Sequence, residues 1–151
     1  MKFKNPPVNS LSLELLTEFI ISLEKLENDK TFRGIILTSD CPRVFSAGLD
    51  LTEMCGKNPA HYAEYWKAVQ ELWLRLYLSN LVLIAAINEI DGQQGTDHAR
   101  QLTKNMMRKT TVDRLVKQRD MDIQNFVSFI SRDSIQKSLQ MYLEKLKQKK
   151  G

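Results

Sequence analysis

The stretch from residue 33 to residue 54 constrains the fold of this chain more than any other part of the sequence. It begins with the apolar run 35–38, whose β-branched residues are typical of a strand buried on both faces. Pro42 follows, and it ends the strand because proline has no N–H to contribute to a ladder. Small residues at 46–48 then lead into residues 49–54, which we expect to begin a helix.

The small residues between this strand and the expected helix have two interpretations. Small side chains let a ligand approach the backbone, and free N–H groups at the start of a helix then point toward it. Such a turn suits an anionic oxygen, either of a phosphate or of an oxyanion that develops during a reaction. The alternative is a tight packing corner that binds nothing.

The literal order of residues favours the first interpretation. Residues 33–38 (RGIILT) and 44–51 (VFSAGLDL) closely resemble the acyl-CoA-binding signature of the crotonase (enoyl-CoA hydratase/isomerase) superfamily, and within it that of the mitochondrial Δ3,Δ2-enoyl-CoA isomerases. Residues 5–11 (NPPVNSL) also match the N-P-x-x-N loop that follows the first strands in that family. Two matches in the right order and separation make coincidence a poor explanation.

Hydrophobic periodicity predicts the remaining elements. Residues 2–4 end a strand, a helix runs from about 13 to 28 with Ser10 or Ser12 as its N-cap, a second helix covers 59–78, and a strand covers 80–88. Three further helices are expected at 97–109, with Asp97 as the cap, at 112–130 and at 133–149. The apolar faces of the helices are expected to contain Leu15, Leu16, Phe19, Ile20, Leu23 and Leu26, then Tyr62, Tyr65, Trp66, Val69, Leu72, Trp73 and Leu76, then Leu115, Val116, Ile123, Phe126, Val127 and Ile130, and finally Ile135, Leu139, Tyr142, Leu143 and Leu146.

These elements predict an α/β protein with an incomplete crotonase-like fold, built from βα units with parallel strands and followed by a C-terminal helical segment. We assign residues 1–88 to the partial core, 89–96 to a connector and 97–151 to helices that cap the active site and pack between subunits in the resembled family. There, the asparagine that ends the strand precedes a glycine-rich turn. Here Asn88 precedes EIDGQQGT, in which the neighbours of Gly92 and Gly95 do not match. We therefore expect a connector rather than a functional turn, with the family's central catalytic segment missing.

The resemblance implies a role for each residue of the small-residue turn. Leu49 would supply the first oxyanion-hole N–H, Gly48 would allow close approach, and the backbone of Ser46 and Ala47 would line the adenine pocket of CoA. The family's catalytic glutamate has no counterpart here. Three acids, Glu53, Glu89 and Asp91, are candidate replacements, and each is better explained as a solvated surface charge.

Other chemistry receives little support from the sequence. His61 and His98 lack an evident partner, so a Ser-His-Asp triad with Ser46 and Asp50 is disfavoured, and Asp50 is expected to cap the helix start. Four lysines near the C-terminus (Lys145, Lys147, Lys149 and Lys150) fit a solvated helix end, with contact to CoA phosphates as the alternative. Cys41 and Cys55 are expected to be free thiols, with no metal site.

Composition bounds the class of protein. With 42% hydrophobic and 26% charged residues among 151, the chain is expected to be one soluble globular domain. Its net charge of +4 favours anionic ligands, and no nucleic-acid motif is present. The apolar run 81–87 is too short to span a membrane. The N-terminus resembles neither a signal nor a transit peptide, although the resembled family is located in the mitochondrial matrix.

Three hypotheses about function follow. The first is a shortened enoyl-CoA isomerase-like protein of unsaturated fatty-acid β-oxidation, with acyl-CoA as its ligand, no cofactor and little activity. The second is a non-catalytic protein that forms mixed oligomers with full-length relatives, or a homo-oligomer, which in the resembled family is a trimer. The third is a chain that does not fold stably, because a parallel sheet without its central strands has open edges.

Overall fold

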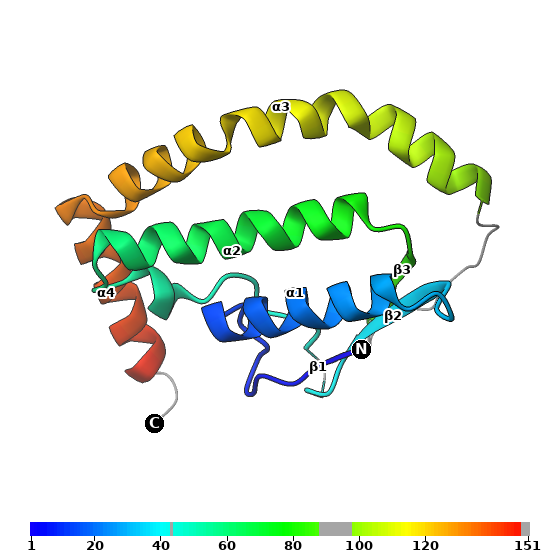
Figure 1. The fold of residues 1–151 in the computed structure, drawn as a ribbon. Helices are drawn as coiled ribbons and strands as arrows, with labels where there is room; N and C mark the ends of the chain where they lie inside the picture. The colour runs from blue at the N-terminus through cyan, green and yellow to red at the C-terminus, as the bar shows by residue number, and fades with distance from the viewer. Residues whose placement is uncertain (43, 88–97, 149–151) are drawn as a thin grey trace.

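Three strands form a parallel sheet in the order β1-β2-β3. The computed structural model describes residues 1–42, 44–87 and 98–148, of which 98–111 by their backbone only. The strands are β1 (Lys2–Phe3), β2 (Gly34–Ser39) and β3 (Val82–Ala85), and Gly34 faces Val82 across the β2–β3 pair. A Cβ on Gly34 would stand 2.8 Å from the Val82 carbonyl oxygen, so the pair needs glycine there. The predicted parallel α/β arrangement is confirmed (Figure 1).

The first two helices lie close to their predicted positions. They are α1 (Leu13–Asn28) and α2 (Pro59–Leu78), with the single 3-10 turn η1 (Leu51–Met54) between them. Ser12, not Ser10, caps α1, because its hydroxyl accepts the Leu15 N–H at 3.2 Å. Asp50 caps η1 as predicted and accepts the Thr52 N–H at 2.9 Å. The helix expected from residue 49 is therefore only this one turn.

The C-terminal segment consists of two helices where three were expected. Helix α3 (His98–Ile130) is continuous through the boundary predicted near residue 110, and α4 (Asp133–Gln148) follows it. Residues 98–130 contain neither glycine nor proline, so nothing in the sequence forces a break. The predicted cap Asp97 lies outside the described residues. In Figure 1, α3 arches over α2, and α4 turns back from its end.

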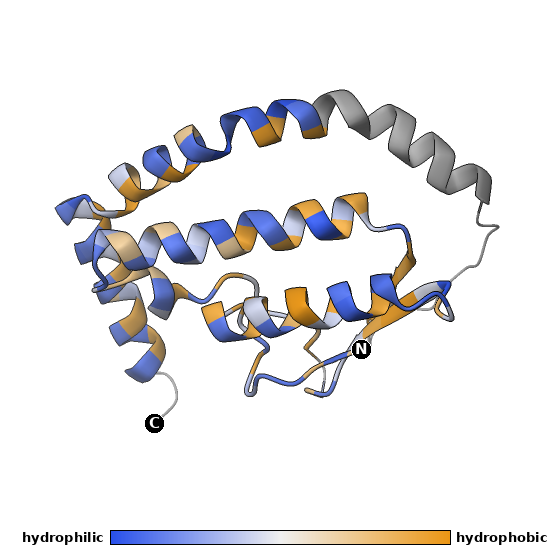
Figure 2. Cartoon of the chain, in the orientation of Figure 1, coloured by the Kyte–Doolittle hydropathy of each residue, from blue (hydrophilic) through white to orange (hydrophobic). Residues whose placement is uncertain are grey.

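Helices cover one face of the sheet. Ile35 and Leu37 of β2 are buried together with Phe19 and Leu23 of α1, and Leu72 of α2 belongs to the same core. Figure 2 shows the apolar stretch along β2 and β3.

The opposite face of the sheet is open. The side chain of Ile36 is 57% exposed and that of Ile84 is 50% exposed. The prediction that this strand is buried on both faces is thus wrong, because the described residues place helices over one face only.

Five residues predicted on buried helix faces lie at the surface: Trp73, Leu115, Val116, Tyr142 and Leu146. Trp73 is 70% exposed, and Leu115 and Val116 of α3 are about half exposed. The C-terminal turns of α3 make the contact with the core instead, through Ile130 and the partly buried Phe126 and Val127. None of the described helices is both long and apolar enough to cross a membrane.

Candidate functional site

The two motifs found in the sequence meet in space. Residues 46–49, which we call the site loop, follow β2, and they lie beside the N-terminal loop of residues 5–11. Leu11 and Leu49 form a parallel bridge: the Leu11 N–H donates to the Gly48 carbonyl at 2.8 Å, and the Asp50 N–H donates to the Leu11 carbonyl at 3.4 Å. The N-terminal loop therefore packs along one side of the site loop.

Asn9 holds the two loops together. Its side chain is completely buried, and its Nδ2 donates to the Ser39 hydroxyl at 2.8 Å and to the Phe45 carbonyl at 3.0 Å. Its Oδ1 accepts the Asn5 N–H at 2.8 Å and the Cys41 thiol at 3.3 Å. The backbone has a φ of 51°, which asparagine tolerates better than most residues. Sequence reasoning placed Asn9 in a motif but missed this role, for which the second asparagine of N-P-x-x-N is the signal.

Ser46 and Ala47 are fixed by bonds to the N-terminal loop. The Ser46 hydroxyl donates to the Asn9 carbonyl at 2.7 Å and accepts the Gly48 N–H at 3.1 Å. The Ala47 N–H donates to the Val8 carbonyl at 2.9 Å. The Ser46 hydroxyl thus binds backbone groups and has no hydrogen bond to a histidine among the described side chains, which argues against a nucleophile. The carbonyl groups of Ser46 and Ala47 accept no hydrogen bond from the described residues, so they are available to a ligand donor.

Leu49 carries a free amide. Because a peptide group is planar and trans, the Leu49 N–H points away from Leu11, toward which the Gly48 carbonyl points. The amides of Ala47, Gly48 and Asp50 all have internal partners, whereas the Leu49 N–H donates to no residue that the structure describes. Such an amide can donate to an anionic oxygen without breaking a bond first.

Open space adjoins this amide. Gly48 has a φ of +82°, and a Cβ placed on it would have no atom within 4 Å. A ligand can therefore approach the backbone from this side, as the small residues predicted. The sequence predicts a helix N-terminus here that would help bind the ligand. The structure has only the 3-10 turn η1 there, so the donor is an amide of the loop.

Tyr65 of α2 forms hydrogen bonds to both strands of the bridge between Leu11 and Leu49. Its side chain is completely buried, and its hydroxyl donates to the Leu11 carbonyl at 2.7 Å and accepts the Asp50 N–H at 3.1 Å. Burial raises the pKa of Tyr65 to about 12, so the hydroxyl keeps its proton at neutral pH. Sequence reasoning counted Tyr65 only as a core residue.

Glu53 and His61 form a pair that the sequence analysis did not predict. His61 Nε2 lies 2.7 Å from Glu53 Oε2, and Glu53 Oε1 accepts the Leu13 N–H at 2.8 Å. The Glu53 side chain is only 16% exposed. The predictions of a solvated Glu53 and a partnerless His61 are wrong, because α1 and α2 close over η1 and bring these groups together. Both carboxylate oxygens are occupied, so Glu53 is not a free base. Glu89, Asp91 and the His98 side chain lie outside the described residues.

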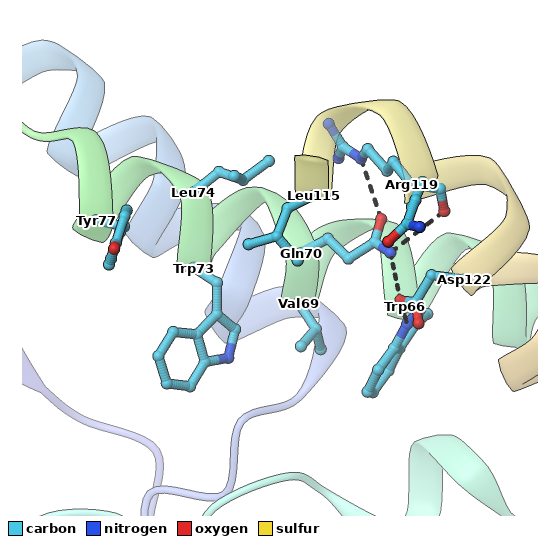
Figure 3. Close-up of a pocket in the computed structure, with 10 residues that line it drawn as sticks. Trp66, Val69, Gln70, Trp73, Leu74, Tyr77, Leu115, Arg119 and Asp122 are labelled. Atoms are coloured by element: carbon cyan, nitrogen blue, oxygen red, sulfur yellow. Dashed lines mark hydrogen bonds between the residues drawn. The ribbon is translucent and has the colours of Figure 1, made fainter. Parts of the chain in front are cut away.

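A cavity of about 430 Å³ lies elsewhere, between α2 and α3. Figure 3 shows its aromatic wall, formed by Trp66, Trp73 and Tyr77 of α2. At its edge, Asp122 accepts the Trp66 indole N–H at 2.8 Å and a Gln70 N–H at 2.7 Å. No residue of the site loop lines this cavity, so it is separate from the free amide.

The cysteines agree with the sequence analysis. Cys41 and Cys55 are free thiols, and Cys41 is buried against Asn9. Within the described ranges, no group of three or more His, Cys, Asp or Glu side chains is arranged to hold a metal ion.

Comparison with known proteins gives a consistent result. The family model "Enoyl-CoA hydratase/isomerase" matches residues 1–90 and 92–150. The mitochondrial enoyl-CoA delta isomerase 1 proteins of Rattus norvegicus and Homo sapiens are each 50% identical, and the matches cover the whole chain and 84% and 80% of those proteins. The crystal structure of human mitochondrial delta3-delta2-enoyl-CoA isomerase matches with a TM-score of 0.90 at 49% identity, covering 100% of this chain and 94% of that one. The Pseudomonas aeruginosa protein DspI matches 58% of this chain and 36% of its own, with a TM-score of 0.54 and 29% identity.

The alignments skip an internal part of the relatives. The alignment with the rat protein extends over 243 residues, whereas this chain has 151. More than a third of the aligned positions therefore have no counterpart here. The two segments matched by the family model meet at residue 91, immediately beyond the strand region that contains β3.

Proposed function

The chain belongs to the enoyl-CoA hydratase/isomerase family, and from this premise we propose that it binds acyl-CoA thioesters at the site loop. Its fold is the incomplete crotonase-like α/β fold, and the whole-length similarity to enoyl-CoA delta isomerases supports an isomerase-like function. The reaction of this class moves a double bond from C3 to C2 of an enoyl-CoA. The names of the curated relatives also support a mitochondrial location.

The observation that carries this proposal is the free Leu49 N–H beside the open space at Gly48. A thioester oxygen placed there accepts the hydrogen bond, and the bond strengthens as removal of the α-proton turns that oxygen into an enolate. The unoccupied carbonyl groups of Ser46 and Ala47 provide acceptors for the adenine amino group. The CoA thioester is the ligand in this proposal, and we expect no separate cofactor.

We propose that the chain retains binding but little isomerase activity. The double-bond shift needs a carboxylate to remove one proton and return it at another carbon. Both oxygens of Glu53 are engaged, by Leu13 and His61. The loss of a single oxyanion-hole donor alone costs about 10²–10³ in kcat. A chain whose described residues offer the Leu49 N–H but no free carboxylate beside it is expected to bind without efficient turnover.

A second candidate is a non-catalytic partner of full-length relatives in mixed oligomers. It is favoured by the open sheet face at Ile36 and Ile84, and by Tyr142 and Leu146 of α4, which are also exposed. These side chains form apolar surface of the kind that protein interfaces bury. Gel filtration of an equimolar mixture with a full-length relative tests this idea, and separate elution of the two proteins would reject it.

The deciding experiment for the first proposal combines binding and turnover. Calorimetric titration with butyryl-CoA up to millimolar concentration should show saturable heat, whereas free butyrate at the same concentration should not. In parallel, a 3-enoyl-CoA is incubated with the chain, and 2-enoyl-CoA is followed by absorbance beside a full-length isomerase. Binding with turnover near background supports the proposal. Absence of heat would reject acyl-CoA binding, and turnover close to that of the full-length enzyme would reject the expected loss of activity.

A further inference from the structure

We propose that Tyr65 is a positioning residue for the Leu49 N–H, because its hydroxyl fixes the backbone on both sides of that amide through Leu11 and Asp50. The inference rests on the proposed binding of acyl-CoA at the site loop. Binding would then depend on a residue of α2, Tyr65, that acts through the backbone of the site loop and not by touching the ligand.

The first step concerns the bridge between the two loops. The direct bond from the Asp50 N–H to the Leu11 carbonyl is 3.4 Å long, which is weak for N–H···O geometry. The Tyr65 hydroxyl stands between these two groups, 2.7 Å from the Leu11 oxygen and 3.1 Å from the Asp50 nitrogen. The shorter bonds therefore pass through Tyr65, and the bridge depends on its hydroxyl more than on the direct bond.

The second step links the bridge to the free amide. Leu11 uses its N–H to hold the Gly48 carbonyl at 2.8 Å, and it uses its own carbonyl to bind Tyr65. The Gly48 carbonyl and the Leu49 N–H belong to one planar peptide group and point in opposite directions. A displacement of Leu11 consequently turns the Leu49 N–H. Gly48 has a positive φ and no side chain, so it offers little resistance to such a turn.

The third step is the rigidity of Tyr65 itself. Its ring is completely buried on α2, whose residues Tyr62 and Val69 are buried in the same core. A ring packed in this way cannot swing to another rotamer without disturbing its neighbours. The hydroxyl thereby transmits the position of α2 to the loop.

A purely structural role is the alternative, and the chain offers a matched control for it. Tyr62 is on the same helix and also buried, and its hydroxyl accepts the backbone N–H of Lys57 at 3.1 Å. Tyr62→Phe removes one hydroxyl that serves the backbone, as Tyr65→Phe does, but away from Leu11, Gly48 and Asp50. Both variants should lose stability, since Tyr65→Phe removes two hydrogen bonds and Tyr62→Phe removes one, but only Tyr65→Phe should affect the Leu49 N–H.

The test reads the donor directly through the ligand. Butyryl-CoA labelled with ¹³C at the thioester carbonyl is bound to each protein, and the carbonyl stretch is recorded by infrared difference spectroscopy. A hydrogen bond from Leu49 lowers this frequency relative to the free ligand. We expect the wild type and Tyr62→Phe to show the same lowering. Tyr65→Phe should lose at least half of it and bind roughly tenfold more weakly. An unchanged carbonyl shift in Tyr65→Phe would overturn the inference, whatever its melting temperature.

A second readout separates this inference from the proposed function. The ¹⁵N–¹H resonance of Leu49 in the ligand-free protein should move in Tyr65→Phe and stay in place in Tyr62→Phe. If the wild type does not bind butyryl-CoA, the proposed function fails, and this resonance still decides the positioning role. If Tyr65→Phe does not fold, 3,5-difluorotyrosine inserted at position 65 keeps the ring and changes the donor strength of the hydroxyl. A Leu49 resonance that does not move then overturns the inference.

Discussion

The loops around Asn9 and the helices of the C-terminal segment are stabilised in opposite ways. Around Asn9, buried polar groups bind backbone groups of neighbouring loops, so the local geometry is specified by short hydrogen bonds. In the described part of α3 only Val112, Ile123 and Ile130 are buried, and α4 contributes no buried residue. The difference shows that hydrogen bonds from neighbouring loops fix the site loop, whereas α3 and α4 have apolar faces that the described residues do not cover.

A few polar contacts attach α4 to the rest of the chain. The Gln136 side chain donates to the carbonyl groups of Met54 and Ile130 at 3.0 and 2.7 Å, and it accepts the Gly56 N–H at 2.9 Å. These bonds connect α4 to the end of η1, to Gly56 in the loop that follows it, and to the end of α3. Substitutions in each region can test whether the two regions differ as much in energy as they do in structure.

The largest effect is expected at Asn9. Asn9→Ala removes hydrogen bonds to four partners in a buried place and leaves a non-glycine residue at φ 51°. The free energy of unfolding should fall by about 3–5 kcal/mol, because several buried groups lose their partners. Urea denaturation measures this loss. The control Asn28→Ala, at the exposed end of α1, should change stability by less than about 0.5 kcal/mol. Similar losses in both variants would contradict the picture of a specified scaffold.

The pH dependence of stability should reveal Tyr65. Its pKa is raised to about 12 in the folded chain, above the ordinary value of 10.0, so the folded state retains a proton that the unfolded state loses. The contribution of this proton to the free energy of unfolding is fully present below pH 10 and is lost as pH rises toward 12. The loss is at most about 2–3 kcal/mol. Denaturation between pH 9 and 11.5 should show a steeper decline in the wild type and in Tyr62→Phe than in Tyr65→Phe. Equal slopes in all three proteins would reject this origin.

The attachment of α4 should depend on Gln136. Gln136→Leu keeps the size of the side chain but removes all three of its bonds, which should destabilise the docking of α4 by about 1–2 kcal/mol. Amide hydrogen exchange in α4 should accelerate roughly tenfold while exchange in α1 stays the same. Gln140→Leu, on an exposed position of the same helix, is the matched control. If both variants leave α4 exchange unchanged, other contacts hold the helix.

The Leu49 N–H can be removed by a backbone substitution. Replacing the residue by its α-hydroxy acid analogue turns the amide into an ester, which deletes the N–H and keeps the side chain. The Leu11 N–H then donates to an ester carbonyl of Gly48, a weaker acceptor, so stability should fall by less than about 1 kcal/mol, whereas the Kd for butyryl-CoA should rise about tenfold. Leu49→Ala, which keeps the N–H, should bind within about threefold of the wild type. The reverse order of affinities would show that the side chain, not the amide, makes the contact.

The smallest effect is expected at Trp73. Its side chain is 70% exposed at the cavity between α2 and α3, so Trp73→Ser should change the free energy of unfolding by less than about 0.5 kcal/mol. Val69→Ala on the neighbouring buried position should cost about 1–2 kcal/mol. Thermal denaturation compares the two. A large loss for Trp73→Ser would mean that this tryptophan is buried in solution, and the contrast between the two regions would weaken.

Much of the fold was predictable because local signals determine it. The bounds of α1 and α2 follow from the apolar period, the Ser12 cap and Pro59, and the site loop follows from its small residues. The pairing of His61 with Glu53 and the network of Asn9 were not predictable, because they join segments that approach only after folding. Periodicity likewise placed Trp73 with the buried face of its helix, since a pattern cannot tell which neighbour will cover each position.

The bridge between Leu11 and Leu49 has a consequence for protein engineering. A designer who transplants residues 44–51 onto another scaffold would carry over the signature but leave behind Val8, Asn9 and Leu11, which bind four of its peptide groups. Such a graft would have the correct sequence, but its loop would lack the hydrogen bonds that fix its conformation. The unit to transplant is therefore discontinuous in sequence: it includes residues 5–11, residues 44–51 and Tyr65 of α2.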